Sequence, residues 1–143
     1  MVVINKSLKI NSSSNFQIID ITDDILNILR VINSDGEKHI SNGTLSVFSK
    51  HSTSAIVVNE NERGLLQDFE RTLNDLIPDK NNYGHDRIDN NASSHLKSFL
   101  LGSSETIPII DGELDLGTWQ SIFFIELDGP RTNRAIDLVF IGE

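Results

Sequence analysis

The sequence contains no cysteine. This absence excludes a disulfide framework, a thiolate nucleophile and thiolate metal ligands, so a metal site in this chain must use histidine, carboxylate or solvent. Long apolar runs are also missing, and every run is far too short to cross a bilayer. The first residues lack the basic region and apolar core of a secretory signal. We therefore expect a cytoplasmic protein with no membrane segment.

Basic residues are scarce as well, because 12 lysines and arginines face 21 acidic residues and the formal net charge is -9. A surface of this sign repels the phosphate backbone and argues against nonspecific binding of nucleic acid. An anionic small molecule can still bind where backbone N–H groups, an arginine or a metal override the global field. A length of 143 residues suits one domain, residues 1–143, with no linker.

Short stretches rich in β-branched and apolar residues, separated by turn signals, predict strands. The expected strands are 2–10, 16–21, 44–49, 55–58, 106–110, 113–116, 120–127 and 134–141. We expect the first two to form an N-terminal hairpin, and the third and fourth to pair as neighbours. The Asp111-Gly112 pair predicts a type I′ turn between the fifth and sixth.

Three helices are expected between these strands. Thr22 reads as the N-cap of the first, the second runs from after residue 61 to about 77, and Asn91 caps a third that ends at Gly102. The stripes expected to be buried are Leu65, Leu66, Phe69, Leu73, Leu76 and Ile77 in the second helix, and Leu96, Phe99 and Leu100 in the third. Because helices and strands do not alternate regularly, the sequence predicts an α+β fold with a mixed, mostly antiparallel β-sheet and about three helices.

Three of the four histidines fall where side chains are usually presented: His51 at a strand edge, His85 in a polar loop and His95 near a helix start. Neutral imidazoles are the commonest zinc ligands, and three protein ligands with an open fourth position form the catalytic arrangement. The alternative is that they are unrelated surface or capping histidines, because their spacing matches no compact metal motif. His39 reads as a surface residue.

Two further segments carry groups suited to chemistry. Glu60, within the Asn-Glu-Asn of residues 59–61, is a candidate carboxylate ligand or general base, unless this segment only caps the next helix. Residues 117–120, Gly-Thr-Trp-Gln, hold the only tryptophan and suit either a wall against a flat ligand or a hairpin corner over the core. Arg131 and Arg134 flank the last turn and suit an anion clamp or surface salt bridges.

Together these segments resemble the YjbQ family, often labelled secondary thiamine-phosphate synthase. The resemblance covers the chain roughly from His51 to its end. Its signature residues here are Ser104, Ile107, Ile109, Gly112 and 117–120, joined by 59–61, Tyr83 with His85, and Asn91 with 95–98. Ser54, Asn90, Ser93 and residues 62–64 depart from the usual family pattern, and none of these departures removes an expected ligand.

The resemblance implies a homotrimer with a histidine-lined pocket for a small phosphorylated metabolite. By position it makes Glu60 and His51 catalytic and lets His51, His85 and His95 hold a divalent metal, zinc before magnesium, or an anion. The residues implied to bind substrate are Asn59, Thr118, Trp119, Gln120 and Arg131. The implied reaction joins an aminopyrimidine methyl diphosphate to a thiazole phosphate and releases pyrophosphate.

Two other functions compete with this transferase. One is a metal-dependent hydrolase of a phosphorylated or amide substrate, in which a zinc-bound water attacks and Glu60 acts as the base. The other is a non-enzymatic protein that sequesters a phosphorylated metabolite in the same pocket.

Overall fold

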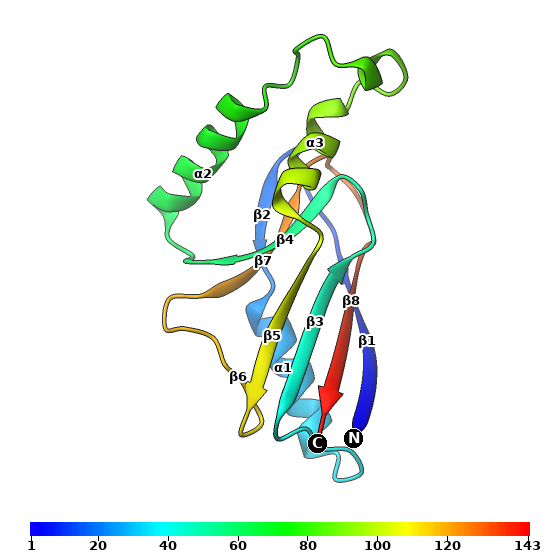
Figure 1. Cartoon of the computed structure of the whole chain (residues 1–143), viewed down its shortest axis with the longest axis vertical. Coiled ribbons are helices and arrows are strands. Elements are labelled where there is room, and N and C mark those ends of the chain that lie inside the picture. Colours follow the sequence, from blue (N-terminus) through cyan, green and yellow to red (C-terminus); the bar gives the residue numbers. More distant parts are fainter.

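The strands form two antiparallel sheets (Figure 1). The computed structural model describes the whole chain, residues 1–143. The larger sheet has the order β1-β8-β3-β5-β6 and the smaller has the order β2-β7-β4. The bounds are β1 Val2–Ile10, β2 Gln17–Asp20, β3 Gly43–Ser49, β4 Ser54–Asn59, β5 Ser104–Ile110, β6 Glu113–Leu114, β7 Ser121–Glu126 and β8 Arg134–Gly142. The predicted α+β class and antiparallel pairing are confirmed.

Two predicted pairings are wrong. β1 pairs with β8 along its whole length and β2 pairs with β7, so there is no N-terminal hairpin. β3 lies in the larger sheet and β4 in the smaller, so these neighbours in sequence are not paired either. Adjacency in sequence is only a statistical guide to pairing. Here the later strand β8 lies between β1 and β3, and β7 lies between β2 and β4. The β5–β6 hairpin is confirmed, and both Asp111 and Gly112 have the positive φ that a type I′ turn needs.

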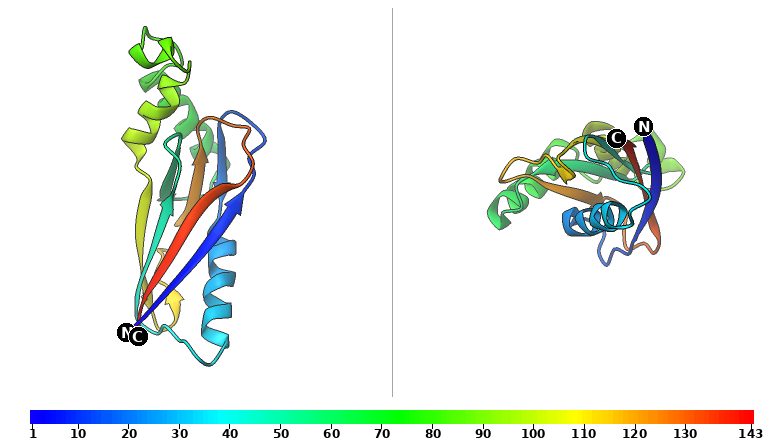
Figure 2. Two further views of the ribbon diagram at one scale, coloured as in Figure 1. Left: turned by 90° about the vertical axis from the view of Figure 1, so that its right-hand side faces the viewer. Right: turned by 90° about the horizontal axis from the view of Figure 1, so that it is seen from below.

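Three α-helices and one short 3₁₀ helix accompany the sheets: α1 Thr22–Ser34, α2 Arg63–Leu76, η1 Gly84–Arg87 and α3 Ala92–Leu101. α1 buries Ile25, Leu29 and Ile32 in the main core. Figure 2 shows α1 on one side of the molecule and α3 with β5 on the other. Thr22 is the first residue of α1, and Ile21 takes the cap position. The hydroxyl of Thr22 accepts the N–H of Ile122 and does not cap the helix. None of these helices has the length and apolar content needed to span a bilayer.

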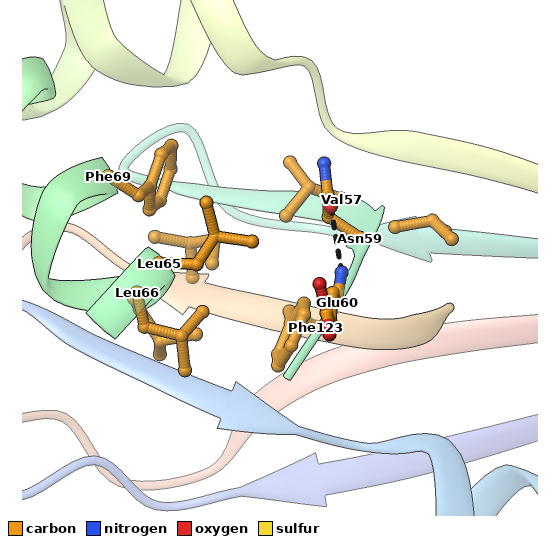
Figure 3. A pocket seen from close by; sticks show the side chains of 10 residues that line it. Val57, Asn59, Glu60, Leu65, Leu66, Phe69 and Phe123 are labelled. Atoms are coloured by element: carbon orange, nitrogen blue, oxygen red, sulfur yellow. Dashed lines mark hydrogen bonds between the residues drawn. The ribbon is translucent and has the colours of Figure 1, made fainter. Parts of the chain in front are cut away.

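β7 is buried on both faces, as expected of a central strand. Ile122 and Phe124 point into the main core, whereas Phe123 and Ile125 point to a second cluster under α2. α2 covers that cluster loosely, since only Leu73 of its predicted stripe is buried and Leu76 is 65% exposed. Other side chains of α2 and the smaller sheet leave an apolar hollow of about 260 Å³ between them (Figure 3).

The predicted inward face of α3 is wrong. Leu96, Phe99 and Leu100 are 38%, 86% and 57% exposed. The helix instead turns its small polar side chains to the protein: Ser94 donates to the carbonyl of Leu127 and Ser98 to the carbonyl of Ser54, each at 2.6 Å. Hydrogen bonds to β4 and to the residue that follows β7 fix the orientation of this helix, and its apolar stripe is left facing outward.

Candidate functional site

His51 lies in the turn between β3 and β4, and its ring is tied to the last strand. The backbone N–H of Ala135 donates to its Nε2 at 2.8 Å, and its own carbonyl accepts the hydroxyl of Ser54 at 3.1 Å. Burial and the nearby Arg134 guanidinium hold the pKa of His51 below its usual value. The imidazole is therefore neutral at pH 7, with its Nδ1 away from the Ala135 contact.

A buried ion pair supports the strands beneath this turn. Arg134 donates from Nε to Glu126 at 2.9 Å and from Nη2 to Thr53 at 3.0 Å. Ser12 and the N–H of Asp128 also donate to the Glu126 carboxylate, at 2.8 and 3.0 Å. Arg134 is 6% exposed and Glu126 is 0% exposed, and each charge has the other as its counter-charge. Arg134 is thus a structural residue and not an anion clamp.

His85 and His95 meet directly. Their rings stand nearly perpendicular with centroids 4.8 Å apart. His95 lies in the first turns of α3, as expected, whereas His85 belongs to η1 and not to an irregular loop. The contact joins η1 to α3, which precede and follow Asn91 in the sequence.

Two adjoining hollows link all three histidines. One, of about 540 Å³, is lined by His51, His95 and Lys50, and the other, of about 360 Å³, by His85 and His95. Phe99 borders both. We call the surface made by His51, His85, His95 and these hollows the histidine face. Its walls include the exposed apolar side chains of α3.

A chain of hydrogen bonds runs behind His85. Its Nε2 lies 3.1 Å from the Asn91 side-chain oxygen, and the Asn91 amide nitrogen donates to Asp128 at 3.0 Å. Arg131 pairs with the same Asp128 carboxylate oxygen at 3.0 Å. The sequence did not single out Asp128, which reads there as an ordinary turn residue. It marked Asn91 as a helix cap and as part of the family resemblance, but gave it no role beside His85. The N–H of Ala92 is capped instead by Asp86.

The other predicted site residues lie at the far end of β4. Asn59 ends this strand and Glu60 follows it, whereas His51 precedes it, and the strand itself spans roughly 17 Å at about 3.3 Å per residue. Both Asn59 and Glu60 line the apolar hollow under α2 (Figure 3). Within one chain, Glu60 therefore does not meet the histidine face. We call Asn59, Glu60 and residues 118–120 the Glu60 corner.

Residues 118–120 belong to this corner because Ser121, which follows them, pairs with Asn59. Trp119 is 73% exposed and covers no core. The side-chain oxygen of Gln120 accepts the N–H of Gly117 at 2.8 Å, which closes the turn, and Thr118 is exposed. A solvent-exposed indole on a turn that is closed by a hydrogen bond suits a contact surface better than a hairpin corner that covers the core.

The residues of one chain do not fit a three-histidine metal centre. No group of three histidine or carboxylate side chains lies close enough to hold an ion. In addition, the Nε2 lone pair of His51 is already engaged by the N–H of Ala135. Only His85 and His95 are in contact.

The chain matches the family described as UPF0047 protein YjbQ-like over residues 6–143, which extends beyond the part that carried the resemblance. It is 52% identical over 143 residues to a UPF0047 protein of Methanothermobacter thermautotrophicus, covering 100% of this chain and 95% of that protein. A solved YbjQ-like protein of unknown function from Sulfolobus solfataricus P2 is similar with a TM-score of 0.91, 37% identity and 99% coverage of each chain. For a hypothetical protein from Aeropyrum pernix K1 the TM-score is 0.90, at 34% identity, with 98% of this chain and 99% of that chain covered.

Proposed function

Because the chain belongs to the family of YjbQ-like UPF0047 proteins, we propose that it is a thiamine-phosphate-synthase-like transferase. Its substrates are an aminopyrimidine methyl diphosphate and a thiazole phosphate. The thiazole nitrogen forms a bond to the methylene carbon while the bond from that carbon to the diphosphate oxygen breaks. The electron pair leaves with pyrophosphate, so the site must stabilise negative charge on a departing anion.

The observation that supports this proposal is the convergence of three histidines and Lys50 on two adjoining hollows. In a chain of net charge -9, the Lys50 ammonium and the His51 imidazole in one hollow suit a phosphate group, with the Asp137 carboxylate 3.9 Å from the ammonium. Phe48 and Phe99 line the same hollow as His51 and offer flat apolar surface to a heteroaromatic ring.

The test is turnover of the two substrates by the purified protein, followed as pyrophosphate release. We expect His51→Ala and His95→Ala to lower kcat/KM about a hundredfold or more, because each removes a positioned polar group. His39→Ala serves as the control and should retain wild-type turnover. Unchanged turnover in both site variants contradicts the proposal. Product formed from water without the thiazole points to the hydrolase, and binding without conversion points to a sequestering protein.

A divalent cation, zinc or magnesium, stays a prediction. Elemental analysis of the purified protein and of His85→Ala checks it, and a stoichiometric ion that disappears from the variant supports a metal site that includes His85. Magnesium that appears only with the diphosphate would indicate that the ion arrives on the substrate.

We also propose that the protein assembles as a homotrimer whose sites are completed between copies. The histidine face and the Glu60 corner lie at opposite ends of β4, and a head-to-tail contact around a ring brings one against the other. Mixing inactive His95→Ala and Glu60→Gln proteins should then restore activity, because a mixed ring contains some intact interfaces. A mixture as inactive as its parts contradicts shared sites, provided that subunit exchange is shown by mass.

A further inference from the structure

The hydrogen bonds of the histidine face point to two histidines held as opposite tautomers. We infer that neutral His51 carries its proton on Nδ1 and donates it to a phosphate oxygen, whereas the neutral form of His85 is the tautomer with its proton on Nε2 and a lone pair on Nδ1. Asn91 and Asp128 are positioning residues for His85. The inference rests on the proposed function only in taking this face as the ligand site.

The assignment at His51 follows from its partner. A backbone N–H can only donate, so Nε2 of His51 must accept from Ala135 at 2.8 Å and carries no proton. The single proton of a neutral imidazole is then on Nδ1. His51 therefore offers a ligand an N–H and not a lone pair, which suits an anion and does not suit a metal ion.

The assignment at His85 follows from two steps along its hydrogen-bond chain. The Asp128 carboxylate, paired with Arg131, only accepts, so the Asn91 amide must turn its NH₂ toward Asp128. The amide oxygen is left facing His85, 3.1 Å from Nε2, and Nε2 must donate to it. In the neutral ring, Nδ1 then has a free lone pair, and no hydrogen bond within the chain engages it.

The ligand class follows from this polarity. Oxygens of a phosphate or diphosphate accept from His51, with the Lys50 ammonium in the same hollow. The lone pair of His85, in the adjoining hollow, accepts a hydrogen bond from an N–H or O–H group of the same ligand. The face thus recognises a phosphorylated molecule that also bears a donor group.

Nuclear magnetic resonance of protein labelled with ¹⁵N-histidine at pH 8 tests both tautomers. We expect two-bond correlations of the Nδ1–H form for His51 and of the Nε2–H form for His85, with a persistent N–H cross-peak for His85. Asn91→Ala and Asp128→Ala should abolish that cross-peak. Asp89→Ala is the control, because the Asp89 carboxylate lies 3.8 Å from Nε2, beyond hydrogen-bond distance, and its loss should leave the cross-peak unchanged.

A pair of matched variants tests the donor role of His51 with inorganic phosphate as the probe. His51→Gln keeps an acceptor for the N–H of Ala135 and loses the Nδ1–H, whereas His51→Asn keeps a donor at the position of Nδ1. We expect His51→Gln to weaken phosphate binding about ten- to a hundredfold, as loss of a hydrogen bond to a charged group does, and His51→Asn to weaken it only a few-fold.

Several results would overturn the inference. These are an Nε2–H tautomer at His51, a His85 cross-peak indifferent to Asn91 and Asp128, phosphate binding by His51→Gln equal to wild type, or added zinc that displaces the Nδ1 proton of His51. None of these measurements needs turnover. Confirmed tautomers together with absent transferase activity would therefore contradict the proposed function and leave this inference standing.

Discussion

At the scale of single residues, the buried pair of Glu126 and Arg134 carries the clearest energetic consequence. Glu126→Gln leaves a guanidinium buried without its counter-charge, and we expect the free energy of unfolding to fall by about 3–5 kcal/mol. The double variant Glu126→Leu with Arg134→Met removes both charges and should recover most of this loss. Chemical denaturation of the three proteins measures the effect, and a single variant as stable as wild type would show that the pair is dispensable.

The same pair predicts how stability depends on pH. Burial alone would raise the pKa of Glu126, but hydrogen bonds from Arg134, the N–H of Asp128 and Ser12 outweigh it and hold the pKa below its ordinary 4.5. The unfolded chain therefore binds a proton first as the pH falls. The stabilisation is complete above about pH 4.5 and is lost as the pH falls from there through the folded pKa.

Denaturation between pH 7 and pH 3 checks this dependence. Wild type should lose more stability over that range than the Glu126→Leu, Arg134→Met protein, which has no pair to protonate. Parallel curves for the two proteins would assign the acid sensitivity to other carboxylates.

Residues also show where sequence reasoning stops. The placement of His95 near a helix start was predicted from local pattern and is confirmed, whereas His51, expected at a strand edge, lies in the connection before β4, and His85, expected in a polar loop, lies in η1. The bond from Ala135 to His51 was not predictable, because it joins residues 84 positions apart. Asn91 stands at a helix start, but its amide is turned away from the helix toward Asp128.

At the scale of elements, α3 is attached to the sheet by hydroxyl groups. We expect Ser94→Ala and Ser98→Ala each to lower the free energy of unfolding by about 1 kcal/mol, since each leaves a buried carbonyl without its 2.6 Å donor. Thermal unfolding measures both. Ser103→Ala, at a position with no side-chain hydrogen bond, is the control, and equal effects of all three changes would contradict the role of the two hydroxyls.

The same helix explains why its orientation could not be predicted. The apolar period of Leu96, Phe99 and Leu100 is real, but it marks an exposed stripe and not a buried one. Periodicity indicates that two faces differ without indicating what covers each. The bounds of strands were easier to predict, because the alternation of apolar and polar residues is a local pattern, and β1 has the predicted bounds. The pairing partners of strands were harder to predict, since β3 and β4 are neighbours in sequence but lie in different sheets.

At the scale of the whole molecule, the outward stripe of α3 leaves an apolar surface beside the histidine face. Phe99 is 86% exposed and Phe48, on the neighbouring β3, is 45% exposed. Contiguous exposed apolar surface of this kind marks an interaction site, and the proposed homotrimer would bury it. Figure 2 shows that α1 lies on the opposite side, which therefore offers a control surface.

We expect wild type to sediment as three copies of a 16.0 kDa chain. Phe99→Ser combined with Leu100→Ser places two hydroxyls in the surface that association would bury, and this protein should sediment as a single chain. Val31→Ser changes a 65% exposed side chain of α1 and should leave the mass unchanged. A wild-type monomer at working concentration contradicts the assembly. If the variant with both α3 substitutions also sediments as a trimer, the assembly stands but its contact lies elsewhere on the chain. The histidine face would then be open to solvent in every copy.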